Sequence, residues 1–152
     1  TTVFARKGKI SDARAAGATS LIVADLPLEA APEIPRVQLV APTSTDERIR
    51  SAAERTDGWL YLVSLTGTKG TRNAVSSQLA GLVQRARALT DRELLAGFGI
   101  STAEQARSVA QLADGVVVGS ALVDALGSDG VAGARRFLRE LRAGLDPAPA
   151  VA

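Results

Sequence analysis

Short apolar runs recur along the chain and are separated by longer segments with helical periodicity. Apart from Gln38, the runs are apolar rather than alternating, as expected for parallel strands that are buried on both faces. We therefore predict five parallel strands at residues 21–24, 37–41, 60–63, 94–97 and 116–118. The segments between them place apolar residues three and four positions apart. This spacing predicts helices at residues 45–55, 76–89, 102–111 and 121–125.

Polar residues at two of these helix starts offer side-chain oxygens to the free N–H groups there. Ser44 or Thr45 stands before Asp46 and Glu47, at the start of the helix predicted after the second strand. Ser101 lies three residues before Glu104, which is the spacing of a capping box. We expect these residues to begin helices.

One helix is absent where the pattern expects it. Between Leu28 and the second predicted strand only residues 29–36 remain, and Pro32 and Pro35 fall inside that segment. Proline removes a backbone donor and disfavours helix at the residue before it. We expect an abbreviated helix or a loop.

The number of strand–helix units favours one α/β domain over residues 1–145, followed by a disordered tail at 146–152. Five units are typical of a doubly wound sheet or of part of a barrel. No Gly-x-Gly-x-x-Gly follows the first strand, and no acidic residue stands at the tip of the next one. We therefore predict a partial or shortened TIM (β/α) barrel, whose edge strands need a partner or a second copy to cover them.

Composition removes several classes of function. The chain has no Cys and no His, which excludes disulfides, thiolate or imidazole metal sites and Ser-His-Asp chemistry. The net charge is only +2, and the basic C-terminal helix also has an apolar face of Phe137, Leu138 and Leu141, so nucleic acid is disfavoured. No apolar run reaches the ~20 residues that span a bilayer, and no signal peptide is evident. We expect a soluble cytoplasmic protein.

Glycine-rich loops follow the last two predicted strands. Gly97, Phe98 and Gly99 lead into Ile100 and Ser101, and Gly119 with Ser120 follows the final strand. In (β/α) barrels the loops after the last two strands commonly bind phosphate, because glycine allows close approach and the helix N-terminus supplies donors. The alternative is that these glycines only form tight turns.

A third loop follows the strand that ends near residue 63. Its residues are Gly67, Thr68, Lys69 and Gly70, a polar pair between two glycines. Such a loop suits a lid that opens and closes over a site. All three loops would open on one barrel face, which favours phosphate binding over simple turns.

Five short sequence motifs together resemble the α subunit of tryptophan synthase over roughly residues 12–143. The motifs are Ala-Asp-Leu-Pro-Leu-Glu, Val-Ala-Pro-Thr-Ser, Tyr-Leu-Val-Ser-Leu-Thr-Gly, Gly-Phe-Gly-Ile-Ser and Gly-Ser-Ala, at residues 24–29, 40–44, 61–67, 97–101 and 119–121. The resemblance implies cleavage of indole-3-glycerol phosphate to indole and glyceraldehyde 3-phosphate. It also implies a partner β subunit that holds pyridoxal phosphate, with no cofactor or metal in this chain.

The resemblance also assigns roles to residues. It places Tyr61 beside the indole and the catalytic carboxylates, and Asp25 at a strand tip near the subunit interface and lid. It makes Phe98 and Leu126 apolar walls. The residues it implies for phosphate are Gly70, Gly99, Gly119 and Ser120.

Two departures from the family change the expectation. Lys69 replaces the lid threonine, and it either neutralises phosphate charge or is a solvated lysine. The first three β–α units are absent, and with them the glutamate and aspartate that the family uses as acid and base. Neither Asp25 nor Glu29 is assigned as a substitute. We therefore expect phosphate binding with little or no lyase activity from the chain alone. Two classes stay open: a lyase completed by units on another chain, or a non-catalytic phosphate-binding or regulatory module.

Overall fold

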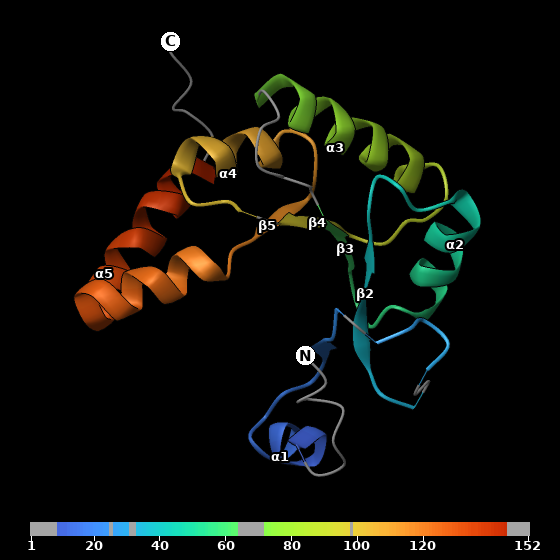
Figure 1. The fold of residues 1–152 in the computed structure, drawn as a ribbon, viewed down its shortest axis with the longest axis horizontal. Helices are drawn as coiled ribbons and strands as arrows, with labels where there is room; N and C mark the ends of the chain where they lie inside the picture. The colour runs from blue at the N-terminus through green and yellow to red at the C-terminus, as the bar shows by residue number, and fades with distance from the viewer. Residues whose placement is uncertain (1–8, 25, 31–32, 64–71, 98, 146–152) are drawn as a thin grey trace.

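The computed structural model describes residues 9–24, 26–30, 33–63, 72–97 and 99–145 (Figure 1). Five strands form one sheet in the order β1-β2-β3-β4-β5, and every neighbouring pair is parallel. The elements are α1 Lys9–Ala15, β1 Leu21–Ile22, β2 Arg36–Val40, α2 Asp46–Arg55, β3 Leu60–Val63, α3 Arg72–Arg87, β4 Leu94–Gly97, α4 Ala103–Ala110, β5 Gly115–Val117 and α5 Ser120–Leu145. The predicted α/β fold with five parallel strands in part of a barrel is confirmed.

The strand predictions hold at the centre of the sheet and fail by small amounts at its margins. β3 and β4 have the predicted bounds, whereas β2 and β5 each begin and end one residue early. β1 keeps only two of its four predicted residues. Among the described strands it pairs with β2 alone, and edge strands of sheets are commonly short.

The sheet has a helix-covered face and an inner face. Figure 1 shows α2, α3 and α4 arranged in an arc around the outer side of the strands. Along β3 the burial alternates, because Leu60 and Leu62 are fully buried whereas Tyr61 and Val63 are partly exposed. Leu60 and Leu62 belong to the core cluster that also contains Leu28, Val40, Ile49, Ala52, Leu79, Leu82, Val83, Ala86, Leu94, Ala96 and Ala113. The core therefore lies between the sheet and its outer helices, and Tyr61 faces the other way.

Three helices, α1, α3 and α5, differ clearly from prediction. α1 was not predicted, and α3 begins at Arg72, four residues earlier than expected. The predicted helix at 121–125 and the basic C-terminal helix are two parts of α5, which is interrupted at Asp129 and Gly130. Periodicity detected both parts and missed the junction between them.

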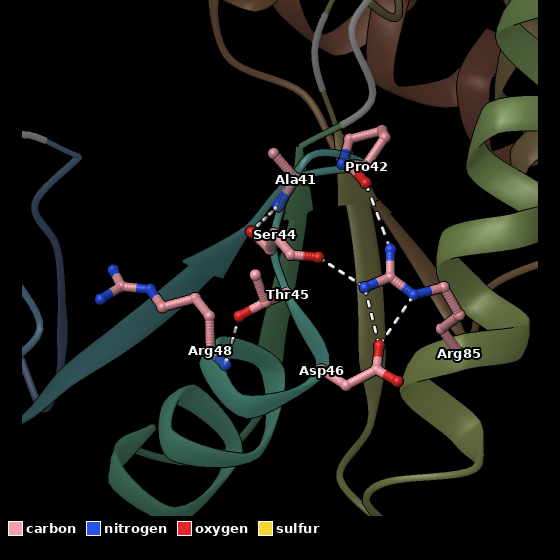
Figure 2. Close-up of polar contacts among 7 residues, drawn as sticks. All are labelled: Ala41, Pro42, Ser44, Thr45, Asp46, Arg48 and Arg85. Carbon is pink, nitrogen blue, oxygen red and sulfur yellow. Dashed lines mark hydrogen bonds and ion pairs between the residues drawn. The ribbon is translucent and has the colours of Figure 1, made fainter.

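One of the two predicted helix caps is correct. Thr45 caps α2, because its hydroxyl accepts the Arg48 N–H at 3.2 Å. The Ser44 hydroxyl accepts the Ala41 N–H at 3.0 Å, as Figure 2 shows.

The predicted Ser101–Glu104 capping box is wrong. α4 begins one residue later than that spacing requires, so Thr102 is the cap and Gln105 is its partner. The Thr102 hydroxyl accepts the Gln105 N–H at 3.2 Å, and Gln105 Oε1 accepts the Thr102 N–H at 3.1 Å. Gln105 Oε1 also accepts the Ser101 N–H at 2.8 Å.

A loop takes the place of the missing helix between β1 and β2. The described residues of 26–35 form turns and no helix, which agrees with the loop alternative. Leu28 is 2% exposed and fills the core there. Nη2 of the buried Arg36 guanidinium donates to the carbonyl oxygens of Pro27 at 2.8 Å, Leu28 at 3.1 Å and Ala30 at 2.6 Å. Arg36 thus satisfies carbonyl groups that a helix would have paired internally.

Arg85 ties α3 to the loop that follows β2 (Figure 2). Its Nε and Nη2 donate to Asp46 Oδ1 at 3.0 and 2.7 Å, and its Nη1 donates to the Pro42 carbonyl at 3.2 Å. Its Nη2 also donates to the Ser44 carbonyl. One side chain therefore fixes the β2–α2 junction from the neighbouring helix.

Candidate functional site

The sheet register brings the last two glycine loops to the same edge. Gly97 of β4 lies opposite Val117 of β5. Gly99 and Gly119 each lie two residues beyond this pair, and neighbouring strands are about 4.8 Å apart. Both loops therefore leave the carboxyl edge of the sheet side by side, as a shared site requires.

The structure gives different reasons for glycine at positions 99 and 119. Gly99 is exposed and has φ of 71°, a left-handed conformation that side-chain-bearing residues rarely adopt. Gly119 has ordinary φ, and a Cβ placed on it would meet nothing within 4 Å. Gly99 is thus needed for the turn, whereas the space beside Gly119 is open to a ligand.

The N-terminus of α5 differs from those of α2 and α4. Thr45 and Thr102 cap α2 and α4 with their own hydroxyl groups. Gly119 precedes α5 and has no side chain, and its carbonyl accepts the N–H groups of Leu122 at 3.0 Å and Val123 at 3.1 Å. The first N–H groups of a helix have no acceptor within the helix. Together with the helix dipole and the exposed Ser120 hydroxyl, they suit an anion.

Tyr61 reaches from β3 across to β4, where Gly97 makes room for it. A Cβ placed on Gly97 would lie 2.8 Å from the Tyr61 hydroxyl oxygen and 2.6 Å from the Val117 carbonyl oxygen. The geometry therefore gives Gly97 a packing role between β3 and β5. Sequence reasoning grouped Gly97 with the phosphate loop and missed this role, because only the register shows what surrounds it.

The Tyr61 phenol is held neutral beside a second aromatic ring. Trp59 contacts it edge-to-face, with ring centroids 5.8 Å apart and the planes at 61°. Burial raises the pKa of the Tyr61 phenol above its ordinary value. A neutral phenol donates a hydrogen bond at physiological pH. The inner face near the glycine loops thus has an aromatic surface with a polar tip.

Several predicted site residues lie outside the described residues. These are Asp25, Gly67, Thr68, Lys69, Gly70 and Phe98. Their assigned roles as lid, phosphate ligands, wall and interface residue stay predictions. Leu126 is described: it lies on α5 and is 48% exposed.

Four of the described carboxylates are engaged by arginines. Asp46, Asp114, Asp129 and Glu29 form ion pairs with Arg85, Arg87, Arg136 and Arg48, respectively. Across the described ranges, no three His, Cys, Asp or Glu side chains gather as a metal site would need. Nor is any helix of the described part long and apolar enough to cross a membrane.

Comparison with known proteins identifies relatives along nearly the whole chain. The family model for the tryptophan synthase alpha chain matches residues 4–144. A curated tryptophan synthase alpha chain from Synechococcus elongatus is 45% identical over 145 residues, which cover 89% of this chain and 54% of that protein. This chain spans about half the length of the curated relatives it matches.

Solved structures have the same fold over the same part. A chain of Mycobacterium tuberculosis tryptophan synthase is 38% identical with a TM-score of 0.76, and the match covers 91% of this chain and 56% of that one. A chain from the tryptophan synthase a2b2 complex of the hyperthermophile Pyrococcus furiosus is 33% identical with a TM-score of 0.71. That match covers 90% of this chain and 58% of the other.

Proposed function

This chain belongs to the tryptophan synthase alpha chain family, and we propose that it supplies the phosphate-binding edge of a site for indole-3-glycerol phosphate. The observation that carries the proposal is the pairing of two loops at one sheet edge. Gly99 and Gly119 lie at the same level beyond the Gly97–Val117 pair, next to a helix N-terminus without a side-chain cap. Backbone N–H groups and the Ser120 hydroxyl would hold the phosphate dianion there, joined by Gly70 from the proposed lid.

The indole end of the substrate would lie toward the inner face of β3. Tyr61 lies beside Gly97 and contacts Trp59 edge-to-face, so the two rings provide a partly buried aromatic surface. Phe98 and Leu126 are proposed to close the apolar walls. The Tyr61 phenol is uncharged at neutral pH, and burial raises its pKa further; an uncharged ring suits contact with an indole ring.

The proposed reaction cleaves the carbon–carbon bond at indole C3 and releases indole and glyceraldehyde 3-phosphate. It needs an acid that protonates C3 and a base for the indole nitrogen and glycerol hydroxyl. We assign neither role to a described carboxylate; Asp46 and Asp114, for example, are paired with Arg85 and Arg87. The acid and base are proposed to come from the β–α units that the longer relatives possess.

Indole would pass to a tryptophan synthase β subunit, the proposed partner, which would hold pyridoxal phosphate. The relative from Pyrococcus furiosus that comes from an a2b2 complex supports this proposal. Self-association through the edge strands β1 and β5, and a cytoplasmic location, stay predictions.

A second candidate is a non-catalytic module that binds a phosphorylated ligand. No described carboxylate is assigned as acid or base, so phosphate binding is the function that the described residues support by themselves. Both candidates require the same phosphate site. They differ only in whether indole is released.

The phosphate site is tested by titrating the full chain with inorganic phosphate and following backbone amide signals. We expect shifts at Gly99, Gly119 and Ser120, and about fivefold weaker binding in Ser120→Ala, the effect of losing one hydrogen bond. Ser108→Ala is the matched control, since that hydroxyl donates to the Glu104 carbonyl of its own helix at 2.9 Å. Absence of shifts at the three residues would refute the site.

The reaction is tested by measuring indole release from indole-3-glycerol phosphate. The assay is run with this chain alone, with a β subunit added, and with a polypeptide carrying the first three β–α units added. The lyase proposal expects release only when those units are present. No release in any combination, with phosphate binding intact, would favour the non-catalytic module.

A further inference from the structure

α5 is two helical arms joined by a corner. Residues 120–128 form the first arm, and residues 131–145 form the second. Between them Asp129 has φ −124° and ψ 15°, and Gly130 has φ 60° and ψ −156°. The Gly130 conformation is open essentially to glycine alone. Figure 1 shows the first arm running away from β5 and the second arm returning toward α4.

The second arm is fixed firmly to α4. A Cβ on the buried Gly144 would lie 2.6 Å from the Ala103 carbonyl oxygen, so the two backbones are in close contact. Arg107 Nε donates to the Gly144 carbonyl at 3.1 Å. Leu141 is 5% exposed and packs with Ile100 in the second core cluster. The direction of this arm is therefore set by the body of the domain.

The first arm has no comparable anchor. None of residues 120–128 is buried, and its apolar Val123 and Leu126 are 66% and 48% exposed. Among the described residues, no buried side chain of this arm fixes its direction. The direction of the first arm is therefore set at its two ends, which are the junction with β5 and the corner at Asp129 and Gly130.

The corner itself is tightly packed. Gly133 on the second arm is buried, and a Cβ placed there would lie 2.7 Å from the Ala125 carbonyl oxygen of the first arm and would collide with Asp129. Arg136 of the second arm pairs with the Asp129 carboxylate. The two arms thus meet at a glycine contact and an ion pair.

From these contacts we propose that Gly130, Gly133 and the Asp129–Arg136 pair are positioning elements for the phosphate site. They transmit the fixed direction of the second arm to the first arm, and so aim the free N–H groups near Gly119 and Ser120 at the ligand. Because hydrogen bonds weaken as they bend, a small rotation of the first arm lowers phosphate affinity. This inference rests on the phosphate site proposed above.

The experiment measures two quantities on the full 152-residue chain: residual dipolar couplings, which give the angle between the arms, and affinity for inorganic phosphate from amide shifts. The variants are Gly133→Ala and Arg136→Ala, and the control is Gly127→Ala. Gly127 is helical, lies on the first arm and has nothing within 4 Å of an added Cβ. Arg136→Ala removes only an exposed pair, so it keeps the test valid if Gly133→Ala does not fold.

We expect both variants to change the couplings of residues 120–128 relative to 131–145 and to weaken phosphate binding, by about fivefold in Gly133→Ala. Gly127→Ala should keep both values. A changed arm angle with unchanged affinity would overturn the positioning role, as would an unchanged angle in both variants. No phosphate shifts in the unsubstituted chain would instead overturn the phosphate site itself, and the positioning role with it.

Discussion

The Tyr61 hydroxyl oxygen lies 2.8 Å from the point where Gly97 would place a Cβ. Gly97 pairs with Val63 on one side and Val117 on the other, so three strands meet at this level. The phenol from β3 occupies the space that a side chain on β4 would take. Tyr61 and Val117 together therefore restrict position 97 to glycine.

We predict that Gly97→Ala destabilises the chain. The new methyl group would be too close to the Val117 carbonyl and the Tyr61 hydroxyl. Overpacking of this kind costs about 1–3 kcal/mol. The measurement is urea unfolding followed by the fluorescence of Trp59, the single tryptophan. Gly81→Ala is the control, because nothing lies near its Cβ within α3 and alanine there should add about 0.5–1 kcal/mol of stability.

Adding Tyr61→Phe to Gly97→Ala should recover only part of that loss. The change removes the hydroxyl oxygen but leaves the Val117 carbonyl 2.6 Å from the new Cβ. Recovery of all or none of the lost free energy would contradict the described geometry. The single variant Tyr61→Phe measures the cost of losing the hydroxyl by itself.

The raised pKa of Tyr61 predicts a loss of stability in alkali. The folded protein holds the phenol proton more tightly than the unfolded chain, so stability falls once the pH exceeds the unfolded pKa of about 10 and continues to fall up to the folded pKa. Tyr61 is the single tyrosine, so tyrosinate absorbance reports it directly. The stability of Tyr61→Phe should fall less over the same pH range. An equal fall in stability would show that ionisation of Tyr61 is not the cause.

Asp114 is predicted to make the chain sensitive to acid. The Arg87 guanidinium and the Leu94 N–H, at 2.7 Å from Oδ2, hold the pKa of the Asp114 carboxyl below its usual value, although burial opposes them. Its stabilisation is therefore present above about pH 4, the unfolded value, and is lost as the pH falls through the lower folded pKa.

The test is urea unfolding of Asp114→Ala and Asp114→Asn at neutral and acid pH. Asp114→Ala loses both contacts and should cost about 1–2 kcal/mol at neutral pH. Asp114→Asn retains an acceptor for Leu94 and should cost less. In both variants the free energy of unfolding should fall less between neutral and acid pH than in the unsubstituted chain. An equal fall would show that other carboxylates cause the loss of stability in acid.

We predict that replacing Arg36 destabilises the chain more than replacing Arg48. Burial lowers the pKa of the Arg36 guanidinium. Arg36→Met would remove a donor from the Pro27, Leu28 and Ala30 carbonyls, of which Pro27 and Leu28 keep contacts with the Ala30 N–H and Arg55. We expect a loss of about 2 kcal/mol or more in the free energy of unfolding. Arg48→Met is the matched control, because its pair with Glu29 is exposed and long, at 3.9 Å, and should contribute under about 1 kcal/mol. Equal losses in the two variants would argue against the buried contacts of Arg36.

The sequence by itself determined the fold class, the central strands and the positions of the glycine loops. β3 and β4 were predicted to the residue, because each is a short apolar run with turn residues on both sides. The α2 cap at Thr45 was also readable, since capping is a local interaction.

The tertiary structure decided what depends on contacts between distant residues. The collision of Tyr61 with any side chain at Gly97 follows from strand register, and the role of Arg36 follows from a loop folded back over the sheet. The corner of α5 also escaped sequence reasoning, because helical periodicity continues on both sides of Gly130. Local patterns record which faces are buried, whereas packing partners far along the chain are fixed only when the strands and helices assemble.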